Sequence, residues 1–180
     1  LYMADLPKPE DNAYIQNIVI VLRRDQAAFL ERTITPVGEE ESAWRYWIRT
    51  RKKEELRQWL ESLANAYSPG SKVVGFETSN LNDLNEPVRV TIKIDVSSYG
   101  TRAGDFLIIR MPGLYYRFPE VAAKTRKYDI WYPTTYCEQR TITVELPKEY
   151  EVYHVPAPLR IKTPYVDYEA SYTVEGNRIV

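Results

Sequence analysis

Residues 88–96 alternate apolar and polar side chains without exception. Valine or isoleucine occupies each even position of this run, and a polar or charged residue occupies each odd position. A period of two predicts a β-strand with one buried face. Residues 166–175 show the same alternation and are followed by Gly176-Asn177, a tight-turn pair, and by the start of a returning strand at 178–180. A chain with these two segments is expected to build its core around β-sheet.

Other apolar or alternating segments extend this prediction. Residues 14–22 are apolar on both parities, which is typical of a strand covered on both faces. Residues 27–35 are expected to return beside them as the second strand of a hairpin. The sequence predicts further strands at 73–78, 106–111, 141–146 and 150–155, with short turns between them.

One segment has a clear helical period. In residues 51–67, Leu56, Trp59, Leu60, Leu63 and Tyr67 form a single apolar stripe, and Ser68-Pro69-Gly70 ends it. Residues 41–50 fit either a strand or a helix. The acidic run Glu39–Glu41 suits the positive end of a helix dipole, which favours the helix.

These patterns predict a mostly β fold, made of β-sandwich modules, with one amphipathic helical insert. The N-terminal half is α+β by content. We expect a linker at residues 1–12, a β-rich domain at 12–112 with its helix at about 51–67, and a small β-sandwich at 113–180. The first residue is Leu1, and the chain stops at Val180 within an apolar segment. We therefore interpret it as a fragment whose last domain is truncated at its C-terminus.

Composition excludes several classes of function. The 24 Lys and Arg residues balance the 25 Asp and Glu residues, which argues against a nucleic-acid-binding module. No apolar run is long enough to span a membrane. With one Cys and one His, the chain can form neither an intrachain disulfide nor a Cys/His zinc cluster. No glycine-rich phosphate loop is present, and we expect no cofactor or metal.

Two polar features are candidate chemical sites. Cys137 and His154 are the sole possible nucleophile–base pair. If a hairpin placed Ile142 beside residues 152–153, Cys137 would lie several residues beyond His154, so we do not expect catalysis. In the loop 79–87, Asp83, Glu86 and the neighbouring Asn82 and Asn85 offer oxygen ligands for Ca²⁺. The loop lacks the ligand order of an EF-hand, which favours a turn-forming role.

Aromatic residues gather between positions 115 and 136. Because flat rings with polar edges stack on sugars or peptide side chains, this cluster is the candidate ligand-binding site. The alternative is an interdomain core with tyrosine hydroxyls at its edge. The cluster consists of Tyr115, Tyr116, Tyr128, Trp131, Tyr132 and Tyr136.

The order of motifs resembles a known family. Residues 79–114, with Tyr99, Arg102, Gly104 and Asp105 in an aromatic-Ala-x-Arg-x-Gly-Asp-type turn, are similar to the segment that follows the catalytic core in bacterial transglutaminase-like envelope proteins. The C-terminal part resembles the small β domain of unknown function that closes those proteins. The motifs that carry this likeness lie at 126–130, 141–152 and 168–179, where Glu149 replaces a usual glycine.

The resemblance implies a non-catalytic accessory region. The nucleophilic Cys of a papain-like core, with its His and Asp, would lie upstream of Leu1. The chain would support that core, its partner in the same polypeptide, or present substrate to it. The protein would be secreted or periplasmic, in the envelope of Gram-negative bacteria. The alternative is a carbohydrate- or peptide-binding module that uses the aromatic cluster.

Overall fold

The computed structural model describes residues 7–113, 124–125, 127–132 and 134–180. A 3-10 helix at Pro9–Asp11 precedes two helices, α1 (Glu39–Thr50) and α2 (Lys53–Tyr67). The strands are β1 (Ala13–Leu22), β2 (Ala28–Pro36), β3 (Lys72–Thr78), β4 (Val90–Val96), β5 (Thr101–Ala103), β6 (Phe106–Ile108), β7 (Cys137–Glu145), β8 (Leu159–Lys162), β9 (Asp167–Ala170), β10 (Val174–Glu175) and β11 (Arg178–Ile179).

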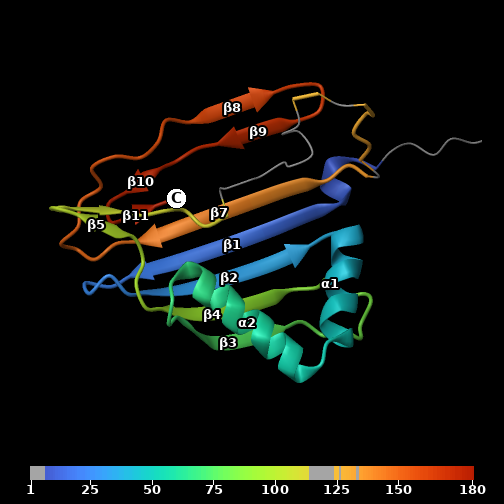
Figure 1. The fold of residues 1–180 in the computed structure, drawn as a ribbon, viewed down its shortest axis with the longest axis horizontal. Helices are drawn as coiled ribbons and strands as arrows, with labels where there is room; N and C mark the ends of the chain where they lie inside the picture. Colours follow the sequence, from blue (N-terminus) through green and yellow to red (C-terminus); the bar gives the residue numbers. More distant parts are fainter. Residues whose placement is uncertain (1–6, 114–123, 126, 133) are drawn as a thin grey trace, which may run out of the picture.

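Seven strands form one sheet in the order β10-β11-β7-β1-β2-β4-β3 (Figure 1). β1 pairs antiparallel with β2 and parallel with β7, which places Ile142 beside Ile18. Strands β5 and β6 form one separate hairpin, and β8 and β9 form another. The mostly β fold with a helical insert is confirmed, and residues 39–50 are helical.

Both helices cover the same face of the sheet (Figure 1), which we call the helix-covered face. α1 packs on β2, and α2 packs on β3 and β4. Alternate residues of the segment 107–111, together with Val152 and Val155, also pack against the core. Burial of these side chains is the main stabilising contribution to the fold. The largest fully buried side chains of this face include Ile18, Ile20, Leu30, Ile92, Ile94 and Val144.

The opposite face of β1 is partly open. Asn17 is exposed and Val21 is 37% exposed, so the expectation that this strand is covered on both faces is wrong. The reason is that both helices follow β2 on one side of the sheet. Nearby strands carry charges on the open face, where Lys93 binds Glu77 at 3.1 Å.

The C-terminal part shares the core of the N-terminal part. β7 lies next to β1, and Ile142 and Val144 extend the apolar face that Ile18 and Ile20 begin. The described residues of 113–180 therefore contribute strands to the large sheet and add the β8–β9 hairpin. This arrangement differs from the separate β-sandwich that we expected. The division into 12–112 and 113–180 stays a prediction, although the sheet runs across it.

The start of β1 is tied to two distant segments. Asn12 is buried, and its side chain donates to Thr134 Oγ1 at 2.9 Å and accepts from the backbone N–H of Glu39 at 3.1 Å. Gly38, the residue just before α1, has a φ of +68°. A Cβ there would overlap the carbonyl of Asp11, so only glycine fits this close approach.

Candidate functional site

The aromatic cluster predicted from the sequence lies partly within the described residues. Tyr115 and Tyr116 lie outside them. Tyr128, Trp131, Tyr132 and Tyr136 are between 53% and 80% exposed. These four rings therefore do not form the buried interdomain core that was the alternative. They precede β7 on a segment without helix or strand, where Lys127 lies 5.5 Å from the centre of the Tyr128 ring.

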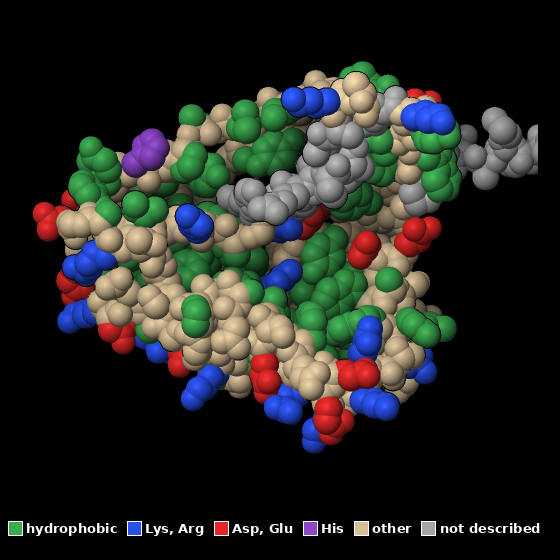
Figure 2. Space-filling view, in the orientation of Figure 1, with side chains coloured by type: hydrophobic (Ala, Val, Ile, Leu, Met, Phe, Trp, Pro, Cys, Tyr) green, Lys and Arg blue, Asp and Glu red, His purple; other side chains and the backbone are tan. Residues whose placement is uncertain are grey.

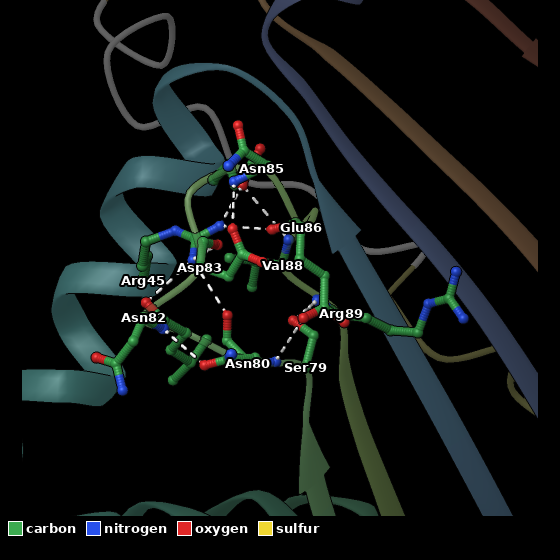
Figure 3. Close-up of polar contacts among 11 residues, drawn as sticks. Arg45, Ser79, Asn80, Asn82, Asp83, Asn85, Glu86, Val88 and Arg89 are labelled. Atoms are coloured by element: carbon green, nitrogen blue, oxygen red, sulfur yellow. Dashed lines mark hydrogen bonds and ion pairs between the residues drawn. The ribbon is translucent and has the colours of Figure 1, made fainter.

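Arg45, on α1, lies at the centre of the polar contacts that hold the loop 79–87, the candidate Ca²⁺ site (Figure 3). Arg45 is 7% exposed, and its guanidinium donates to the carbonyl oxygens of Leu81, Asp83 and Glu86 at 2.8–3.0 Å. It also donates to Glu41 Oε1, one helical turn earlier, at 2.7 Å. A Ca²⁺ ion would need carbonyl oxygens that converge on it. Here the carbonyl oxygens converge on the guanidinium of Arg45 instead.

Side chains of the same loop hold its turns. Asn80 Oδ1 accepts from the N–H of Asn82 at 3.1 Å, and Asp83 Oδ1 accepts from the N–H of Asn85 at 2.9 Å. Both are local turns in which a short polar side chain bonds the backbone two residues on. Within the described residues, no group of three or more His, Cys, Asp and Glu side chains is placed to hold a metal ion. These contacts confirm the turn-forming interpretation of the loop.

Cys137 and His154 lie in different surroundings. Cys137 begins β7, where it pairs with Ala13 and is half-buried, whereas His154 is exposed in a segment after β7. The expected hairpin between 141–146 and 150–155 is wrong, because the neighbours of β7 are β1 and β11. Among the hydrogen bonds of the described residues, none joins the Cys137 thiol to the His154 ring, so the geometry gives no support to a nucleophile–base pair.

A polar cluster that the sequence analysis missed interrupts the helix-covered face near the start of β1. We call it the Arg32 cluster, and it consists of Tyr14, Gln16, Arg32, Glu138 and Arg140. Gln16 donates to Glu138 Oε1 at 3.0 Å, and Arg32 donates to the Tyr14 hydroxyl at 3.2 Å. Arg140 forms an ion pair with Glu138 and donates to the carbonyl of Gly113. The register places these side chains together, because Tyr14 and Gln16 lie opposite Glu138 and Arg140.

Burial shapes the electrostatics of this cluster. It raises the pKa of the Glu138 carboxyl, although the Arg140 guanidinium and the hydrogen bond from Gln16 act in the opposite direction. Burial also raises the pKa of the Tyr14 hydroxyl, against the effect of Arg32. The ring of Tyr14 stacks on Trp44 of α1, with centroids 6.0 Å apart and planes 18° apart. The cluster thus combines charges with an aromatic wall at the edge of an apolar face.

The sequence contains a signal for this cluster. Arg32 has the parity of Leu30 and Ile34, and Arg140 has the parity of Ile142 and Val144. A charged side chain on the buried parity of a strand is expensive unless it is paired, and therefore marks a site to examine. The pattern alone could not show that the two arginines lie on the same face, since that depends on the pairing of β1 with β7.

Comparison with known proteins adds one finding. Residues 108–180 match DUF3858, a domain of unknown function. This match supports the expectation that the C-terminal part is a domain of unknown function. The DUF3858-like region contains β7 to β11 and the four exposed rings, and it supplies Glu138 and Arg140 to the Arg32 cluster. No curated protein and no solved structure matches the chain.

The helices give one further result. Of the helices that the structure describes, none has the length and apolar character needed to cross a membrane.

Proposed function

We propose that this chain is a non-catalytic region of a transglutaminase-like envelope protein, and that it binds and supports the catalytic core of the same polypeptide. The exposed aromatic surface of residues 128–136 carries the proposal. It consists of Tyr128, Trp131, Tyr132 and Tyr136, which expose between 53% and 80% of their area within nine residues. Large exposed aromatic side chains in one segment are typical of protein contact surfaces.

The β8–β9 hairpin supports the same proposal. Its strand residues are exposed except for the half-buried Ala170. Three of its exposed side chains, Leu159, Ile161 and Tyr168, are large and apolar. In the described chain this hairpin pairs with no further strand, and an isolated hairpin is marginally stable in water. A protein partner packed on it would bury these side chains and supply the missing stability.

Ligand binding by the same rings is the second candidate. The Trp131 ring is 80% exposed, and a flat exposed indole is suited to stacking on a sugar ring or a peptide side chain. Both candidate functions use the same aromatic surface, but one binds the catalytic core and the other binds a sugar or a peptide. A direct binding experiment with both partners therefore separates them.

The test measures binding of the chain to the transglutaminase-like core expressed separately. We expect saturable binding and a rise in the melting temperature of the mixture. Trp131→Ala and Tyr128→Ala are expected to weaken binding about tenfold, since aromatic anchors contribute most to interface affinity. Tyr46→Ala is the matched control, because Tyr46 is also exposed but lies on α1.

Either of two outcomes would overturn the proposal. One is no binding to the core by the folded wild-type chain. The other is an equal loss of binding for Tyr46→Ala and Trp131→Ala. Saturable binding of a glycan or peptide array that depends on Trp131, without binding to the core, would establish the second candidate instead.

A further inference from the structure

Arg32 is a cation within an apolar face. It pairs in register with Ile18 on β1 and with Ile92 on β4, which are 1% and 0% exposed. The Arg32 side chain is half-buried, and among the described residues no carboxylate lies within ion-pair distance of it. Its Nε is buried and has no hydrogen-bond partner there. The Tyr14 hydroxyl, at 3.2 Å from Nη2, is its one hydrogen-bond acceptor among those residues.

Arg45 shows how this protein completes a buried guanidinium. Arg45 donates to four backbone carbonyls and to the carboxylate of Glu41. A guanidinium has five N–H donors, and leaving donors and charge unmatched away from water is costly. Unlike Arg45, Arg32 has no carboxylate in ion-pair contact, although the Glu138 carboxyl interacts with it at longer range, and it lacks most of its acceptors. This difference indicates a position prepared for an acceptor that comes from outside the described residues.

The described surroundings of the cluster are partly apolar. Figure 2 shows the middle of the helix-covered face hollowed, with hydrophobic side chains on its floor and Lys or Arg side chains inside it. The stacked rings of Tyr14 and Trp44 form an apolar wall beside Arg32. The described cluster contains two guanidinium groups and one carboxyl group, that of Glu138. The Arg32 guanidinium attracts an anion, whereas the Glu138 carboxylate disfavours a second negative charge on it.

We propose that the Arg32 cluster binds a carboxylate. The guanidinium of Arg32 supplies the charge and a two-pronged donor set, which matches the two oxygens of a carboxylate. The Tyr14 hydroxyl accepts from Arg32 and donates its own hydrogen to the same ligand. A phosphate dianion fits less well, because Glu138 would repel its second charge. The carboxylate belongs either to a protein segment or to a free small molecule, and the experiment distinguishes these sources. This proposal does not rest on the aromatic surface of residues 128–136.

The first experiment follows the Nε–H signal of Arg32 in a ¹H–¹⁵N spectrum during titration with sodium acetate. We expect a saturable shift with a dissociation constant on the order of millimolar. N-acetylglutamate methylamide, with a peptide-like backbone, is expected to bind more tightly if the natural ligand is a protein segment. Acetate will match or exceed it if the natural ligand is a free carboxylate. Sodium chloride at equal ionic strength is the control for salt effects.

Variants separate binding from structure. Arg32→Lys keeps the charge but loses the two-pronged donor set, and is expected to weaken acetate binding at least fivefold. Arg23→Gln is the matched control, since Arg23 forms a half-exposed pair with Asp95 on the surface, and it should bind acetate as wild type does. Equal shifts with chloride and acetate, or a saturable shift that survives in Arg32→Lys, would overturn the proposal.

If the Arg32 Nε–H signal cannot be observed, the melting temperature provides a second test. In buffer without carboxylates, Arg32→Met is expected to melt at the same or a higher temperature than wild type, because it removes an incompletely paired cation. Acetate should raise the melting temperature of wild type and leave that of Arg32→Met unchanged. A lower melting temperature of Arg32→Met together with no acetate effect on wild type would show that Arg32 is purely structural.

Discussion

The side-chain oxygen of Asn12 accepts a hydrogen bond from the backbone N–H of Glu39 at 3.1 Å, across 27 positions of sequence. Glu39 is the first residue of α1, and the preceding Gly38 offers no side chain to cap the helix. Asn12 therefore caps α1 from outside the helix. Its amide also reaches Thr134, so one buried side chain joins the starts of β1 and α1 to the segment before β7.

Replacing Asn12 with alanine should destabilise the protein. Asn12→Ala removes the cap and leaves buried polar groups without partners, so we expect the free energy of unfolding to fall by about 2 kcal/mol. Urea unfolding followed by circular dichroism measures this loss. Asn17→Ala, at an exposed position of β1, should change stability by less than about 0.5 kcal/mol. Equal effects of the two variants would show that Asn12 has no special role.

Removing Arg45 should loosen the loop 79–87. Arg45→Met leaves Glu41 without its ion pair and the loop carbonyls without their donor, and we expect a loss of about 3 kcal/mol or more. Amide hydrogen exchange at Asn82 and Asn85 should become faster. Arg49→Met, on an exposed position in the last turn of α1, is the control and should cost less than about 1 kcal/mol.

The same loop permits a test of the Ca²⁺ hypothesis. Because the guanidinium of Arg45 occupies the position between the carbonyls, millimolar Ca²⁺ should leave the melting temperature of wild type unchanged. A clear rise in the presence of Ca²⁺, absent with Mg²⁺, would contradict the structural interpretation of the loop.

Glu138 should make stability depend on pH. Burial raises the pKa of this carboxyl above its ordinary value of 4.5. Between 4.5 and the raised value, the folded state binds more protons than the unfolded state, so the free energy of unfolding falls as pH rises. Glu138→Gln removes this contribution, and its stability relative to wild type should therefore increase between pH 4 and pH 7.

Urea unfolding at several pH values measures this effect. The control is Glu145→Gln, which removes a carboxylate that pairs with Arg178 near the surface of the same strand. We expect only the Glu138 variant to lose part of the pH dependence. A relative stability of Glu138→Gln that stays constant or decreases from pH 4 to pH 7 would contradict the raised pKa.

Several strands and the helix α2 could be predicted from the sequence because their signals are local, whereas residues 41–50 fitted either a strand or a helix. The alternation in 88–96 became β4, and the apolar stripe of 51–67 became α2 against β3 and β4. Burial of one face repeats with the geometry of the element itself, so a short stretch of sequence contains the information. The acidic run Glu39–Glu41 likewise marked the first turn of α1.

Of the two candidate sites, the sequence predicted the aromatic segment but not the Arg32 cluster. The aromatic segment was found from composition, and the structure supplied its exposure. The Arg32 cluster was not found, although Arg32 breaks the buried parity of β2, because its partners come from β1 and β7. The sequence separation between Gln16 and Glu138 is 122 residues, and no local pattern records such a contact.

The sequence by itself determined the mostly β character, the helix α2 and the turn chemistry of the loop 79–87. Only the tertiary structure decided that β7 lies parallel to β1 and that the C-terminal strands share the N-terminal core. The physical reason is that every strand of this chain offers a similar ladder of backbone donors and acceptors and a similar apolar face. The choice of neighbour depends on the packing of the whole sheet, which also brings Arg32, Glu138 and Arg140 to one place.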